Sequence, residues 1–77
     1  MRGKAMHRYA VIFEHPDSAE NWSAFVPDLP GCVSVGDSFD ECRENIQEAI
    51  TFHLQGMRED GEPIPAPSTR VDYAEVA

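Results

Sequence analysis

The chain has 77 residues and a net charge of −8, with 14 acidic residues against 6 basic ones. This length predicts one small domain, and a domain of this size buries only roughly 60% of its unfolded surface, so self-association would add needed stability. The negative charge argues against direct nucleic-acid binding, because phosphates would be repelled. It suits a soluble protein or one with a basic partner.

The amino terminus divides into a tail and the start of the domain. Residues 1–6 are basic and lack the apolar region of a signal peptide, so we expect a flexible tail followed by a domain over 7–77. The sequence contains no apolar run long enough to cross a bilayer, which predicts a cytoplasmic protein without a membrane segment. Residues 7–14 and 22–26 alternate as strands on either side of a polar turn and predict a hairpin.

A third strand over 32–35 is followed by a capping signal and a long helix. Ser38 stands three residues before Glu41, the spacing at which each residue satisfies a backbone N–H at the helix start. Apolar residues then recur at helical spacing on one side, which predicts a helix from 38 to about 59 with a stop near Gly61.

The last part of the chain predicts an extended crossing and a fourth strand. Three prolines within 62–67 exclude helix and central strand there, and 70–76 then alternates as a strand. The order β-β-β-α-β predicts an α+β fold, with an antiparallel-rich sheet covered on one face by one helix. The first two strands are apolar on both sides, so we expect the second face to be buried against another copy. The residues expected at this oligomer interface are Phe25, Phe52 and Tyr73.

Catalytic chemistry is weakly indicated. The three histidines have no ligand spacing and there is no C-x-x-C motif, so we predict no metal site and no cofactor. Cys32 and Cys42 are interpreted as structural thiols. A metal-dependent nuclease would need Glu14, Asp28 and a third carboxylate to converge, and an exposed acidic surface is the better interpretation of these residues. Phe52 falls on the polar side of the helix, either under the proline segment or open to a partner.

Four sequence runs together resemble the HicB-like antitoxin family. They are Tyr9-Ala-Val, the stretch from Trp22 to Glu41 that contains P-D-L-P-G-C and S-V-G-D-S, then Glu48-Ala-Ile and Gly61-Glu-Pro-Ile-Pro. The resemblance extends over residues 8 to about 76. It implies a degenerate RNase H-like fold, a homodimer or homotetramer, and a non-catalytic antitoxin that binds and occludes HicA, a small basic mRNA interferase.

The resemblance also bears on DNA binding, on the residues expected to contact the toxin and on the alternative functions. Longer relatives carry a DNA-binding domain after this region, whereas this sequence ends one residue past the predicted fourth strand, so we expect no DNA binding from it. An acidic surface beside a rigid turn would dock a basic toxin. The residues predicted to contact it are Pro27, Asp28, Leu29, Pro30, Glu41, Glu44 and Glu48. The alternatives are a stand-alone oligomeric domain and a remnant RNase H-like nuclease.

Overall fold

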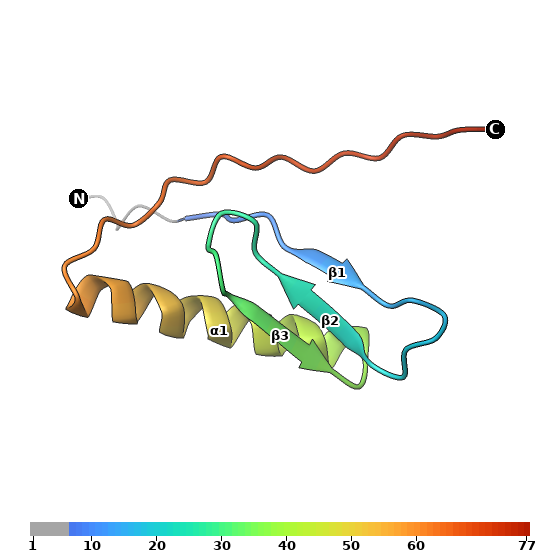
Figure 1. Cartoon of the computed structure of the whole chain (residues 1–77), viewed down its shortest axis with the longest axis horizontal. Coiled ribbons are helices and arrows are strands. Elements are labelled where there is room, and N and C mark those ends of the chain that lie inside the picture. The colour runs from blue at the N-terminus through green and yellow to red at the C-terminus, as the bar shows by residue number, and fades with distance from the viewer. Residues whose placement is uncertain (1–6) are drawn as a thin grey trace, which may run out of the picture.

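A computed structural model describes residues 7–77, and the predicted tail at 1–6 lies outside the described residues. Three strands form one antiparallel sheet in the order β1-β2-β3, and a single long helix lies across one side of it (Figure 1). The small α+β fold is therefore confirmed. The elements are β1 (Ile12–Glu14), β2 (Trp22–Phe25), β3 (Val33–Gly36) and α1 (Phe39–Glu59).

The core lies between the helix and one face of the sheet. Strand pairing sets Phe13 opposite Ala24 and Ala24 opposite Ser34, so these residues share the face toward the helix. The helix contributes Cys42, Ile46 and Leu54, which are four and eight positions apart and lie on the side that the periodicity predicts. The buried apolar core consists of Ala24, Val26, Leu29, Cys32, Cys42, Ile46 and Leu54.

Both ends of the helix are capped by the residues that the sequence indicates. The Ser38 hydroxyl accepts a hydrogen bond from the Glu41 N–H at 3.1 Å, while the Glu41 carboxylate accepts from the N–H of Asp37, one residue earlier than the predicted box requires. Gly61 has φ +73° and its N–H bonds the carbonyl of Arg58, while the next N–H bonds Met57. This pair of bonds is a Schellman motif, which confirms the predicted stop.

The predicted fourth strand is wrong for the described chain. Residues 70–76 are extended but belong to no strand, and they run along the β1 side of the sheet without pairing to it (Figure 1). A strand requires a ladder of backbone hydrogen bonds with a neighbour. Beyond Thr69 the hydrogen bond that the structure records is local, from the N–H of Tyr73 to the carboxylate of Asp72. The similarity to RNase H therefore stays a prediction.

The first strand is shorter than predicted, again because part of the predicted strand has no neighbour to pair with. It begins at Ile12 instead of residue 7, because its partner β2 ends at Phe25, opposite Ile12. After Phe25 the chain turns toward β3, where the Val26 N–H bonds the carbonyl of Cys32 at 3.1 Å. Residues 7–11 consequently have alternating apolar side chains but no strand to pair with.

Candidate protein-binding surfaces

The turn over residues 27–31 is rigid, and its side chains divide between core and surface. Leu29 donates its N–H to Val26 and accepts from the N–H of Cys32, both at 3.0 Å, while Gly31 adopts φ +84°. Leu29 is only 1% exposed, whereas Pro27 and Pro30 are exposed. Leu29 therefore packs in the core and holds the turn in place, and the two prolines are the members of this predicted contact set that face solvent.

Asp28 anchors the last segment of the chain. Its carboxylate accepts hydrogen bonds from the N–H and hydroxyl groups of both Ser68 and Thr69, at 2.6–3.1 Å. The Thr69 hydroxyl and the Ser68 N–H are the leading causes that lower the pKa of Asp28 from 3.8 to about 2, since these bonds favour the charged carboxylate. Nearby, the Tyr9 hydroxyl donates to the carbonyl of Pro65 at 2.5 Å. Sequence reasoning treated Asp28 as a partner contact and missed this internal role.

The outer face of α1 is acidic. Glu41, Glu44 and Glu48 are all exposed there, and Glu44 and Glu48 line a shallow hollow together with Arg43 and Gln47. The Glu41 carboxylate is already hydrogen-bonded to the helix-start backbone. Glu44 and Glu48 are therefore the members of this set whose charge is available without a structural task.

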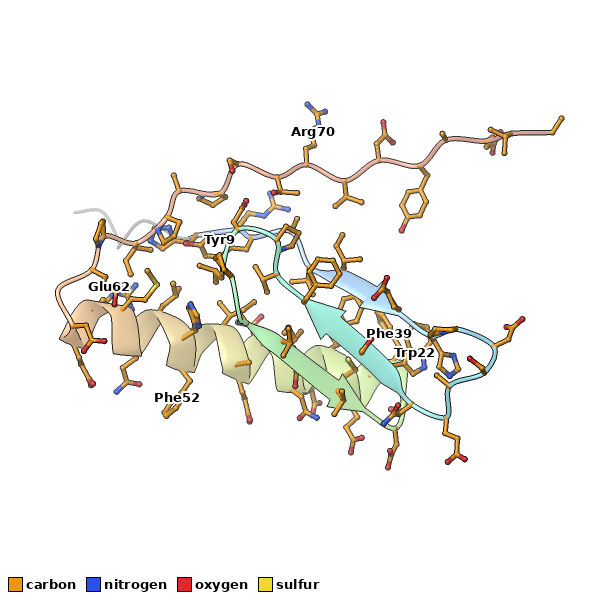
Figure 2. The ribbon with its side chains drawn as sticks, viewed as in Figure 1. Tyr9, Trp22, Phe39, Phe52, Glu62 and Arg70 are labelled. Atoms are coloured by element: carbon orange, nitrogen blue, oxygen red, sulfur yellow. The ribbon has the colours of Figure 1, made fainter. Side chains whose placement is uncertain are left out.

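Phe52 extends this face as an exposed aromatic side chain. It is 77% exposed and points away from the sheet (Figure 2), so the proline segment does not cover it. It lines one hollow with Pro30, Gly56, Met57 and two acidic residues at the helix end. Pro30 of the turn thus lines the same hollow as Phe52, and Phe52 follows Glu48 by one turn of the helix.

The second face of the sheet is apolar and uncovered within residues 7–77. Phe25, Val33 and Val35 are 37%, 64% and 56% exposed, and they line a hollow with Glu14 and Ser23. Sequence reasoning named Phe25 here but missed Val33 and Val35. Val33 and Val35 are two residues apart in the third strand, so their side chains lie on the same face of the sheet, and this spacing could have identified them.

The groups required by the catalytic alternatives do not come together. Within residues 7–77 no group of three His, Cys, Asp or Glu side chains is placed to hold a metal ion. The oxygens of Asp28 are occupied by four internal hydrogen bonds. Cys32 and Cys42 are buried, and burial raises the pKa of each thiol, which disfavours the reactive thiolate. In the same part of the chain, no helix combines the length and hydrophobicity that crossing a membrane requires.

Comparison with curated proteins finds similar chains in phages, bacteria and archaea. An uncharacterized 14.9 kDa protein of Haemophilus phage HP1 is 55% identical over 40 residues, which cover 52% of this chain and 30% of the phage protein. A UPF0150 protein of Synechocystis is 36% identical over 80% of this chain and 77% of its own length. Antitoxin HicB 2 of Photorhabdus laumondii is 35% identical over 82% of this chain. The match spans 44% of that antitoxin, less than half of its length.

A solved structure and a family profile agree with these relatives. A chain of the HicA3 and HicB3 toxin-antitoxin complex superposes with a TM-score of 0.65 at 29% identity, over 80% of this chain and 70% of the other. The profile described as HicB-like antitoxin of bacterial toxin-antitoxin systems matches residues 9–76, nearly the whole sequence. The chain therefore belongs to the HicB-like antitoxin family.

Proposed function

We propose that this chain is a non-catalytic, cytoplasmic antitoxin module that binds a small basic HicA-type mRNA interferase, covers its catalytic groove and keeps RNA out. The observation that carries the proposal is the match over most of the chain to a structure of a HicA3 and HicB3 complex, together with family membership. The net charge of −8 supports it, because opposite charge speeds encounter with a basic partner.

The contact surface that we propose is the continuous face formed by the acidic side of α1, Phe52 and Pro30. Glu44 and Glu48 would attract cationic side chains of the toxin, and exposed Phe52 would supply buried apolar area at the centre. Pro30 lies at the edge of the same hollow as Phe52 and adds a rigid rim. Pro27 and Asp28 lie in the same turn, where Asp28 contributes by fixing the chain rather than by offering free charge.

An RNA-cleavage assay tests the function itself. The purified chain would be titrated into the HicA-type protein of the organism that supplies it, with a labelled RNA as the substrate. We expect cleavage to fall to background at a fixed molar ratio of the two proteins. Undiminished cleavage in the presence of a large excess of this chain would contradict the antitoxin proposal.

A charge-reversal pair locates the surface. Glu44→Lys with Glu48→Lys should slow association by about tenfold at low salt and by less at high salt, because exposed charges are screened. The control reverses Asp17 and Glu20, two exposed acids in the turn between β1 and β2, which changes net charge equally. An equal effect of both pairs would mean that only net charge matters and that α1 is not the docking face.

A further inference from the structure

The sheet has an unpaired edge at β3, on the side away from residues 70–77 (Figure 1). One side of β3 pairs with β2, and within residues 7–77 no strand pairs with its other side, which we call the β3 edge. Such an edge presents backbone donors and acceptors to any extended chain that aligns with it. The β3 edge is therefore a possible binding site outside the contact face proposed above.

The backbone groups of alternate residues in β3 point away from β2. In an antiparallel pair the N–H and C=O of one residue face the partner strand, and those of the next residue face outward. The carbonyl of Val35 accepts a hydrogen bond at 2.8 Å from the side-chain amide of Asn45 on α1, so Val35 faces outward. Cys32 faces inward, because its carbonyl accepts from the N–H of Val26 at 3.1 Å. Val33 follows Cys32 and therefore also presents its N–H and C=O at the β3 edge.

Asn45 leaves most of the β3 edge open. It occupies one acceptor, the Val35 carbonyl, and the remaining outward groups are the N–H and C=O of Val33 and the N–H of Val35. The side chains of Val33 and Val35 lie on the sheet face opposite the helix, where they are 64% and 56% exposed and line an apolar hollow with Phe25. An added strand would therefore gain both backbone hydrogen bonds and buried apolar area.

The helix side of the same edge is acidic. Asn45 reaches the β3 edge from α1, and Glu41 and Glu48 lie one helical turn before and after it on that face. Both are exposed, and Glu48 carries its charge without the backbone hydrogen bond that Glu41 accepts from Asp37. Side chains alternate between the two faces along a strand. An added strand would thus place every second side chain beside the apolar hollow and the others toward the glutamates, which suits alternating apolar and basic residues.

Charge and position disfavour two other occupants. Pairing the β3 edges of two copies would bring the glutamates of both copies together, in molecules that each have a net charge of −8. Residues 70–77 of the same chain run along the β1 side, at the opposite edge of the sheet (Figure 1), and they contain two acids and one cation. The β3 edge therefore fits a basic partner better than it fits this chain.

We propose that an extended segment of the basic toxin adds to the β3 edge as a further strand of the sheet. Its apolar side chains would lie beside Val33 and Val35, and its basic side chains beside Glu41 and Glu48. The inference rests on the proposed function, which supplies the basic partner, and it adds strand addition to the contact made by α1. Asn45 limits the length of the new ladder, because it already holds the Val35 carbonyl.

Amide hydrogen exchange tests strand addition directly. The full chain would be followed by NMR, alone and bound to the HicA-type protein of the same organism. In the chain alone we expect rapid exchange at Val33 and Val35 and slower exchange at Ser34, whose N–H faces β2. In the complex the exchange of Val33 and Val35 should slow by at least about tenfold, because each N–H gains an acceptor. A complex in which both amides exchange as fast as before would overturn strand addition and leave the proposed function standing.

Proline substitution gives a second test. Val35→Pro removes an outward N–H and spares the bonds of β3 to β2, a position at which an edge strand tolerates proline. We expect toxin binding to weaken by at least about tenfold in calorimetry, whereas Val35→Thr keeps the N–H and the branched side chain and should bind within about twofold. Val33→Pro should act like Val35→Pro, and circular dichroism checks that each variant folds.

The outcomes separate the inference from the function on which it rests. Folded proline variants that bind the toxin as tightly as Val35→Thr would overturn strand addition alone. An unmodified chain that neither binds nor inhibits the toxin would overturn the proposed function and strand addition together. If a proline variant fails to fold, the exchange rates of Val33 and Val35 in the unmodified complex still decide the question.

Discussion

The body of the domain and its last segment, residues 70–77, here called the arm, are built in opposite ways. In the body, sheet and helix bury a shared apolar core, and both ends of the helix are capped. The arm contributes none of its side chains to that core, and within residues 7–77 its hydrogen bonds to the body lie at its base, through Asp28 and Tyr9. Changes in the body should therefore alter the free energy of unfolding, whereas changes at the anchor should alter the position of the arm.

The largest effect is expected where the body packs most tightly. Leu29→Ala removes a side chain that is 1% exposed and should lower the free energy of unfolding by about 2–5 kcal/mol, as large-to-small changes in cores do. That loss is enough to unfold much of a domain this small. Urea denaturation followed by circular dichroism measures it, with exposed Phe52→Ala as the control. Equal stability of the two variants would show that the turn is not part of the core.

A second change in the body tests the contact between β3 and α1. A Cβ added at Gly36 would collide with the backbone N and Cα of Cys42 at the start of the helix. Gly36→Ala should therefore cost about 1–3 kcal/mol of stability, the usual range for overpacking. The same denaturation experiment applies. An unchanged midpoint would mean that helix and strand do not approach as closely as described.

Removing the anchor, which is the set of hydrogen bonds between Asp28 and the Ser68–Thr69 pair, should affect the arm and leave the body unchanged. Asp28→Asn replaces an acceptor-only carboxylate with an amide that presents donors to the N–H groups of Ser68 and Thr69. We expect trypsin to cleave after Arg70 several-fold faster while the urea midpoint changes little, because the core is intact. Cleavage after Arg58, inside α1, is the internal reference. Faster cleavage at both sites would indicate that the anchor also stabilises the body.

The anchor should also respond to acid. The pKa of the Asp28 carboxyl is lowered from 3.8 to about 2. The stabilisation of the base of the arm by the carboxylate is therefore fully present above pH about 3.8 and is lost as the pH falls through about 2. The amide resonances of Ser68 and Thr69 should therefore shift with an apparent pKa near 2 in NMR titrations. In Asp28→Asn this transition should be absent. A midpoint near the ordinary value would show that the four hydrogen bonds do not form in solution.

The smallest expected effect has the opposite sign. Gly56 lies within α1, and a Cβ added there meets no atom within 4 Å. Gly56→Ala should raise stability by about 0.5–1 kcal/mol, because alanine loses less backbone entropy in a helix. Together with Gly36→Ala it forms a matched pair of glycine changes. A destabilised Gly56→Ala would imply that a neighbour packs on this part of the helix.

The parts of the fold that local rules determine were predictable from sequence. Ser38 and Gly61 mark the two helix ends through hydrogen bonds within a few residues, and the alternation around Trp22 places one side of β2 in the core. The fourth strand was predicted by the same alternation, yet a strand also needs a neighbour, and that depends on distant or intermolecular contacts. Periodicity contains no information about either.

In the candidate site, too, the features that depend on neighbouring residues were predictable and those that depend on distant residues were not. The exposure of Glu44 and Glu48 follows from their angle on the helix and was predicted. The role of Asp28 was missed because its partners, Ser68 and Thr69, lie 40 and 41 residues away. Leu29 was assigned to the surface because a turn is usually exposed, but the turn folds inward on this side chain.

We propose that this chain silences a HicA-type toxin through the face formed by α1 and Pro30. The most direct measurement is RNA cleavage by that toxin as the chain is added, run in parallel with the Glu44→Lys, Glu48→Lys variant. We predict full inhibition by the unmodified chain, and at low salt a variant that needs about tenfold more protein for the same inhibition. Toxin activity that persists at every concentration of the unmodified chain would contradict the claim.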